Sequence, residues 1–218
     1  MAELLSVCYV ALFAASGIGL SRLLFYREKP LIRIWLGLAF GMAMLIWFPA
    51  LFSFAMGFYL PAQLLGLLLA CGVGAVGFIF SRKHTMIQTP WKAEVPFFIA
   101  GGVVLTICLV LLSTHTIVLR DGALYVGQST YGDLSMHLGF ISSIATQGTF
   151  PPMYSICPDK PVCYPFLSES VGSTIYLFGT SLRFATMLTA AYAMLLVVTG
   201  VYCFFEEWLG ETRKSVFA

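Results

Sequence analysis

Residues 95–112 read VPFFIAGGVVLTICLVLL, a run without a single charged side chain. As a helix, such a run is long enough to cross the roughly 30 Å hydrocarbon core of a bilayer. Comparable runs cover residues 4–25, 31–54, 60–81 and 182–205. The whole chain is 59% hydrophobic and 10% charged, whereas a soluble domain carries about a quarter charged residues. We therefore expect an all-α polytopic membrane protein with about five transmembrane helices.

The long interval between the fourth and fifth runs divides the chain into three parts. Residues 1–112 are expected to form a four-helix transmembrane segment, residues 113–181 an extracytoplasmic loop, and residues 182–218 the fifth transmembrane helix and a cytoplasmic tail. A loop of this length between two spans is long enough to carry function.

Lysine and arginine residues set the expected orientation, because positive charges in short loops stay cytoplasmic. They cluster within residues 22–33 and 82–92, whereas the loop at residues 57–61 carries no charge. We therefore expect a protein of the cell membrane with its amino terminus outside and its tail, with Arg213 and Lys214, in the cytoplasm. Because the basic residues lie in short clusters beside the apolar runs, the net charge of +2 does not indicate nucleic-acid binding. Membrane lipid is the expected partner, and no nucleic-acid partner is expected.

Three elements are predicted within the outer loop. The largely apolar segments 116–119 and 123–126 flank Arg120-Asp121-Gly122, which is typical of a small β-hairpin that turns at Asp121-Gly122. Residues 133–147 show apolar side chains at helical spacing and are followed by Gly148, which predicts an amphipathic helix. Residues 167–178 are too few to span the membrane and are expected to form a second short helix that lies on it or dips into it.

Cys157 and Cys163 bracket the sequence Pro-Asp-Lys-Pro-Val in the outer loop. Because cysteines on the oxidising side of a membrane pair readily, we expect a disulfide between them that closes a tight loop. Its stabilisation would be modest, about 2 kcal/mol. Two free thiols are the alternative.

Residues 129–138, STYGDLSMHL, place a carboxylate and an imidazole in an otherwise apolar sequence. Asp133 and His137 lie one helical turn apart on the same face. Asp133 is a residue type that favours the helix N-cap position. Where a membrane surface desolvates its carboxylate, it can also act as a general base on a hydroxyl group. The two roles are compatible. His137 could orient that carboxylate, bind a lipid phosphate when protonated, or supply part of a metal site.

Two further residues of the loop are candidate substrate contacts. Glu169 is a carboxylate in the first turn of the predicted second short helix, and Tyr164 opens the preceding Tyr-Pro-Phe sequence. A structural role for Glu169 is the alternative. Two ligands are too few for a metal site, so a divalent metal is an optional cofactor here and not a requirement.

The order of these motifs resembles the first large outer loop of membrane glycosyltransferases of the C superfamily. The resemblance is carried by Gly132-Asp133-Leu134-Ser135-Met136-His137-Leu138, by Gln147-Gly148-Thr149-Phe150-Pro151-Pro152, and by Tyr164-Pro165-Phe166-Leu167. The protein mannosyltransferases and related enzymes that use polyprenyl-phosphate sugars are the members it suggests most. In that superfamily an aspartate at the start of this loop acts as a base or metal ligand, and Asp133 is the matching position.

The resemblance covers residues 129–181 and departs from the family in two respects. The family places its aspartate after the first span, whereas here four spans precede it, and the whole enzymes have many more than five spans. The chain is therefore expected to be either the amino-terminal part of a longer protein, which would add further transmembrane segments or a partner subunit, or a reduced homologue.

The resemblance implies that the chain is a candidate membrane glycosyltransferase. It would transfer a sugar from a polyprenyl-phosphate donor to an acceptor hydroxyl on the outer face. The alternative is a non-catalytic polytopic protein, a scaffold or a binder of lipid or of an envelope component. Transport is a weaker alternative, because the spans contain few ionisable residues.

Overall fold

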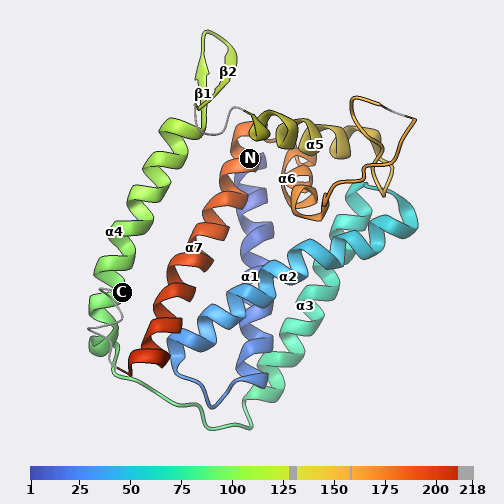
Figure 1. The fold of residues 1–218 in the computed structure, drawn as a ribbon. Helices are drawn as coiled ribbons and strands as arrows, with labels where there is room; N and C mark the ends of the chain where they lie inside the picture. Colours follow the sequence, from blue (N-terminus) through green and yellow to red (C-terminus); the bar gives the residue numbers. More distant parts are fainter. Residues whose placement is uncertain (128–131, 158, 211–218) are drawn as a thin grey trace.

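The computed structural model describes residues 1–127, 132–157 and 159–210. Within these residues, five helical stretches are long and apolar enough to cross a membrane. They are α1 (Ala2–Leu24), α2 (Pro30–Met56), α3 (Leu60–Ser81), the stretch Lys92–Thr116 around α4 (Val95–Leu111), and α7 (Leu182–Leu209) (Figure 1). The expected multi-pass, all-α membrane fold is confirmed. The expected cytoplasmic tail with Arg213 and Lys214 lies outside the described residues.

Shorter elements complete the chain. A 3₁₀ turn, η1 (Trp91–Glu94), precedes α4, and a π-helical turn, η2 (Leu112–Thr116), follows it. The strands β1 (Ile117–Arg120) and β2 (Ala123–Val126) come next, and α5 (Asp133–Gln147) and α6 (Leu167–Leu177) lie between them and α7.

The helices α1, α2 and α3 pack against one another through glycine. A Cβ atom added at Gly17 of α1 would lie 2.1 Å from the carbonyl oxygen of Gly37 and 2.3 Å from the amide nitrogen of Gly41, both on α2. Gly74 of α3 approaches the backbone of Ser16 in the same way. Small residues let membrane helices approach closely. Because lipid tails are as apolar as the helix surfaces, the hydrophobic effect does not drive these helices together, and close van der Waals packing stabilises the bundle instead.

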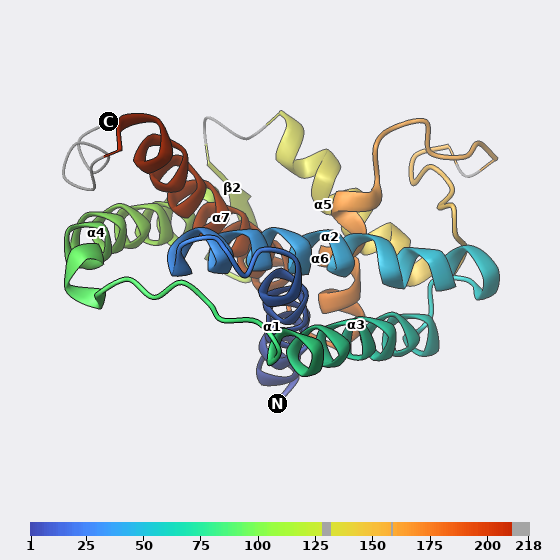
Figure 2. The ribbon, with the colours of Figure 1, turned by 90° about the horizontal axis from the view of Figure 1, so that it is seen from below.

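Helix α4 stands apart from this group. It packs mainly against α7, and Figure 2 shows it on the far side of α7 from α1 and α3. Phe97 is its one buried residue. Apolar side chains around the rest of α4 are therefore left for lipid or for other membrane helices.

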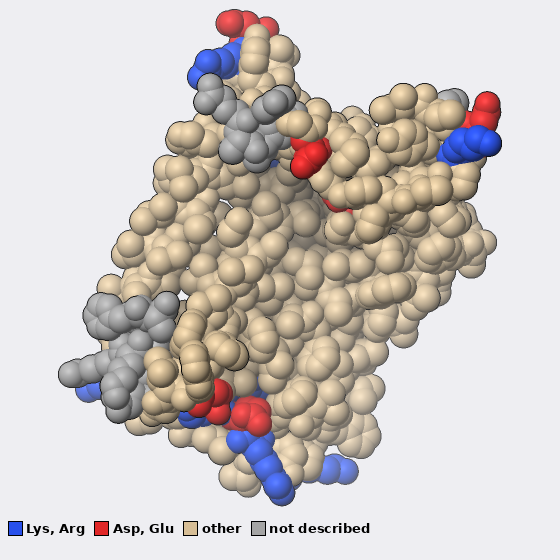
Figure 3. Space-filling view, in the orientation of Figure 1, with Lys and Arg blue, Asp and Glu red and all other residues tan. Residues whose placement is uncertain are grey.

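Charged side chains gather at the two ends of the molecule and leave a broad apolar zone between them (Figure 3). We call the end that carries the hairpin, α5 and α6 the α5–α6 end. The opposite end, where α1 and α3 finish, is called the basic end because residues 22–33 and 82–92 carry most of the lysine and arginine. This distribution matches a helical bundle that spans a bilayer.

Helix α6 is embedded in the bundle. Residues 170–175 are all buried. Thr174 Oγ1 donates to Gln63 Oε1 at 2.8 Å, and Gln63 Nε2 donates to Ser53 Oγ at 3.1 Å. Because Gln63 is fully buried in α3, this network gives a buried amide the partners it needs and fixes α6 against α2 and α3.

The β-hairpin forms as predicted. Strands β1 and β2 pair antiparallel from Ile117–Val126 to Arg120–Ala123. Asp121 and Gly122 have φ values of 49° and 78°, the left-handed geometry that Asp-Gly favours in a two-residue turn. The side chain of Arg183 in α7 donates to the carbonyl oxygen of Ile117 at 2.9 Å and so ties the hairpin to the bundle.

The expected disulfide is wrong, because Cys157 and Cys163 are both exposed free thiols. The loop is closed by its backbone instead: Met153 bridges Pro161, and the amide of Tyr154 donates to Lys160 at 2.8 Å. In this register Cys157 stands at the tip of the turn and Cys163 lies beyond the paired segment. The two thiols are therefore not opposite each other.

Candidate functional site

Asp133 is the first residue of α5, and its side chain is exposed. Gly132 occupies the N-cap position, and no side chain caps the helix. Asp133 is therefore not the N-cap of α5, which was one of the two roles considered for it. Its carboxylate lies in the first turn, where the helix dipole favours a negative charge, and the side chain is open to a ligand or to the membrane surface.

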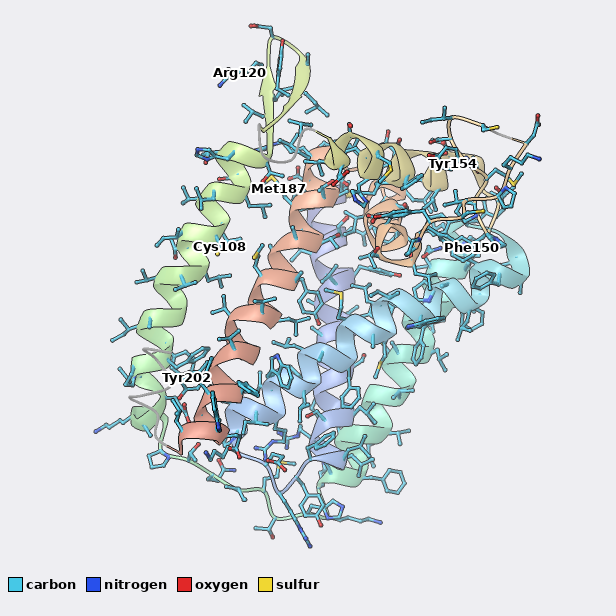
Figure 4. All side chains as sticks on the ribbon, in the orientation of Figure 1. Cys108, Arg120, Phe150, Tyr154, Met187 and Tyr202 are labelled. Atoms are coloured by element: carbon cyan, nitrogen blue, oxygen red, sulfur yellow. The ribbon has the colours of Figure 1, made fainter. Side chains whose placement is uncertain are left out.

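The far end of α5 is fixed to the turn between α2 and α3. Gly148 ends the helix with a φ of 69°, and its carbonyl oxygen accepts from the amide of Phe58 at 2.8 Å. A Cβ atom at Gly148 would lie 2.5 Å from the hydroxyl oxygen of Tyr59. Figure 4 shows Phe150, the second residue after Gly148, close to this same turn. The docking sets the direction of α5 across the bundle.

His137 and Glu169 form the central contact of the site. His137 Nδ1 donates to Glu169 Oε1 at 3.0 Å, and the side chains are 28% and 16% exposed. Ser168 Oγ donates to the same carboxylate oxygen at 3.2 Å. Because a carboxylate on one imidazole nitrogen fixes the ring orientation, the other nitrogen, Nε2, is held ready for a ligand.

Tyr164 lies beside this pair. Its ring centroid is 5.8 Å from that of His137 and 5.6 Å from that of Phe140. Phe140 is buried, whereas Tyr164 is 41% exposed. Tyr164 therefore presents an aromatic surface to solvent on a fixed support.

The described residues do not fit a metal site built by the protein alone. Among them, no three His, Cys, Asp or Glu side chains are arranged to hold a metal ion. A metal ion at Asp133 and His137 would therefore need ligands from outside this group of residues.

A hollow lies at the base of the hairpin, apart from His137 and Glu169. It has a volume of about 610 Å³ and is lined in part by His115, Arg120 and Tyr125. Arg120 stands on the hairpin, well away from Tyr154 in the loop that follows α5 (Figure 4). This hollow is a separate surface that an anionic ligand could reach.

The structure brings three of the four predicted site residues together. His137 contacts both Glu169 and Tyr164, and Asp133 lies one turn before His137. Sequence reasoning missed Phe140, which supports Tyr164. Its position three residues after His137 could have indicated that the two share a face.

No protein-family model matches the chain, and no curated protein or solved structure matches it either. The site must therefore be interpreted from its own geometry.

Proposed function

We propose that this chain is a glycosyltransferase-like membrane module. It transfers a sugar from a polyprenyl-phosphate donor to an acceptor hydroxyl at the α5–α6 end. The observation that carries the proposal is the contact of His137 with Glu169 and Tyr164 at one end of an apolar bundle, one helical turn after Asp133. A lipid-linked sugar needs a polar site within reach of the membrane, and these residues supply one.

Each residue has a role that suits its position. Asp133 is exposed and accepts the proton of the acceptor hydroxyl. His137, when protonated and held by Glu169, binds the phosphate of the donor. Tyr164 offers a flat aromatic face for the apolar side of a sugar ring.

The transfer needs no covalent intermediate. The acceptor oxygen gives its proton to Asp133 and forms a bond with the anomeric carbon of the sugar. The bond from that carbon to the phosphate oxygen breaks, and polyprenyl phosphate leaves with the electron pair. Most of the acceleration would come from positioning and from electrostatic stabilisation of the leaving group.

The basic residues favour an orientation in which the α5–α6 end faces outside. Residues 22–33 and 82–92 at the other end carry most of the lysine and arginine, and such residues in short loops stay in the cytoplasm. The donor would then be reached from the outer leaflet.

Asp133→Asn tests the proposal. Because Asp133 is exposed and makes no capping bond, the substitution should leave folding intact and lower sugar transfer by about 10²-fold or more. The matched control is Asp121→Asn in the hairpin turn, which should retain transfer. The measurement is the release of labelled sugar from a polyprenyl-phosphate donor by reconstituted protein, and equal turnover by the two variants would remove Asp133 from the mechanism.

A non-catalytic role has a distinct outcome in the same experiment. If the wild-type protein binds the donor but transfers no sugar to any acceptor hydroxyl, the site recognises an envelope component without acting on it. That result would contradict the proposed reaction.

A further inference from the structure

A groove at the basic end combines aromatic rings with a carboxylate. It has a volume of about 490 Å³ and runs between the start of α2 and the end of α7. Its lining residues are Ile32, Trp35, Gly200, Cys203, Phe204, Glu207 and Trp208. The reaction proposed above leaves this groove unused.

One aromatic wall of the groove is held in place by a hydrogen bond. Trp35 Nε1 donates to the carbonyl oxygen of Leu196 at 3.0 Å, which fixes the indole ring on α7. A Cβ atom at Gly200 would lie 2.7 Å from Trp35 Nε1, so the glycine allows this close approach. Phe204 and Trp208 pack with ring centroids 5.9 Å apart and remain 63% and 70% exposed.

Acidic side chains lie beside the groove. Lys29 Nζ lies 3.1 Å from Glu206 Oε1 and 3.1 Å from Glu207 Oε1, so one cation is shared by two carboxylates. Glu206 is buried, and its Oε2 has no hydrogen-bond partner among the described residues. Two carboxylates and a single ammonium group therefore lie next to the aromatic walls.

We propose that this groove binds the ammonium headgroup of a membrane phospholipid. A cation is attracted to the faces of tryptophan and phenylalanine, and aromatic cages of this kind recognise ammonium groups. Glu207 supplies the opposite charge at the groove, and the phosphate of the same lipid can lie toward the lysine and arginine residues that crowd this end. The groove opens where a membrane-spanning helix ends, which makes a bilayer lipid the occupant.

Lipid retention tests this proposal. The protein is purified from vesicles that contain equal amounts of phosphatidylethanolamine and phosphatidylglycerol with the same acyl chains, and the retained lipids are counted by native mass spectrometry. The wild-type protein should retain phosphatidylethanolamine about fivefold over phosphatidylglycerol, the ratio that about 1 kcal/mol supplies. Glu207→Gln and Trp208→Ala should abolish this preference.

Matched variants separate the groove from the rest of the membrane interface. Glu28→Gln removes a carboxylate at the same end, and Trp47→Ala removes an exposed tryptophan of α2. Both should keep the wild-type preference. Absence of a preference in the wild-type protein, its survival in Glu207→Gln, or an equal loss in Trp47→Ala would overturn the proposal.

Discussion

The contact between His137 Nδ1 and Glu169 Oε1 joins residues 32 positions apart in the chain. Neither side chain stands out on its own, since an isolated histidine or glutamate near a membrane surface is common. Their pairing beside an exposed Tyr164 makes the α5–α6 end a site. At the scale of residues, the candidate chemistry therefore depends on one partly buried hydrogen bond between His137 and Glu169 and on the exposed carboxylate of Asp133 one turn before His137.

Lys29 offers a pH-dependent test at the basic end. Burial lowers the pKa of its ammonium group, but hydrogen bonds and charges from Glu206 and Glu207 outweigh this effect and raise the pKa above its ordinary 10.5. A group whose pKa is raised on folding stabilises the protein below its unfolded pKa and loses that contribution as pH rises through the folded pKa. The stabilisation should therefore be complete near pH 8 and disappear at strongly alkaline pH.

We expect Lys29→Met to destabilise the protein by about 1 kcal/mol at pH 8. The cost is below that of breaking a fully buried pair, because Lys29 is 38% exposed and solvent screens its charge. Thermal unfolding in a neutral detergent, followed by circular dichroism, measures the difference. The control Lys83→Met, at the same end, should show little change, and a Lys29→Met deficit that persisted above the raised pKa would refute the assignment.

Among the elements, α6 shows how buried polar groups place the site. Its residues 170–175 are buried in the bundle, and Thr174 reaches Gln63 of α3. Glu169 stands at the start of this same helix, so the network that fixes α6 also fixes the partner of His137. The α5–α6 arrangement is therefore set from within the bundle.

Thr174→Val should weaken this placement. It leaves Gln63 Oε1 without the Thr174 hydroxyl, and an unsatisfied buried acceptor costs about 1–3 kcal/mol. Thr106→Val is the control, because the Thr106 hydroxyl is exposed and bonds only within α4. Unfolding by a denaturing detergent should show the loss for Thr174→Val alone, and equal stabilities would mean that α6 is held by other contacts.

The packing of α1 against α2 yields a second prediction for elements. In Gly17→Ala the new Cβ would meet backbone atoms of α2, which cannot move aside cheaply, and overpacking of this kind costs about 1–3 kcal/mol. Gly72→Ala is the matched control, since nothing lies within 4 Å of a Cβ there. The same detergent titration should separate the two variants, and indistinguishable curves would contradict close packing at Gly17.

At the scale of the whole molecule, most of the fold could be predicted from residues that lie close together in the sequence. Apolar runs predicted the five spans, Asp121-Gly122 predicted the hairpin turn, and Gly148 predicted the end of α5. These features depend on residues that are close in the chain. The site depends on distant ones: nothing local indicates that Gln63 would anchor α6 or that Glu169 would face His137.

The prediction of a disulfide between Cys157 and Cys163 was wrong for a related reason, because it considered only their spacing in the sequence. Cys157 and Cys163 are close in the sequence, but the backbone pairing of Met153 with Pro161 determines where each thiol lies. Register in a short loop is set by hydrogen bonds across it, and a shift of a few residues separates side chains that spacing alone would pair.

Hydrogen–deuterium exchange of the wild-type protein in lipid nanodiscs tests the central claim most directly. A polyprenyl-phosphate sugar is added, and amide exchange is compared with that in polyprenol alone. Binding at the proposed site should slow exchange at the start of α5, around Asp133 and His137, and at residues 164–169, because a bound ligand protects the segments it orders. Unchanged exchange in both segments, or protection confined to the hairpin hollow around Arg120, would contradict the account.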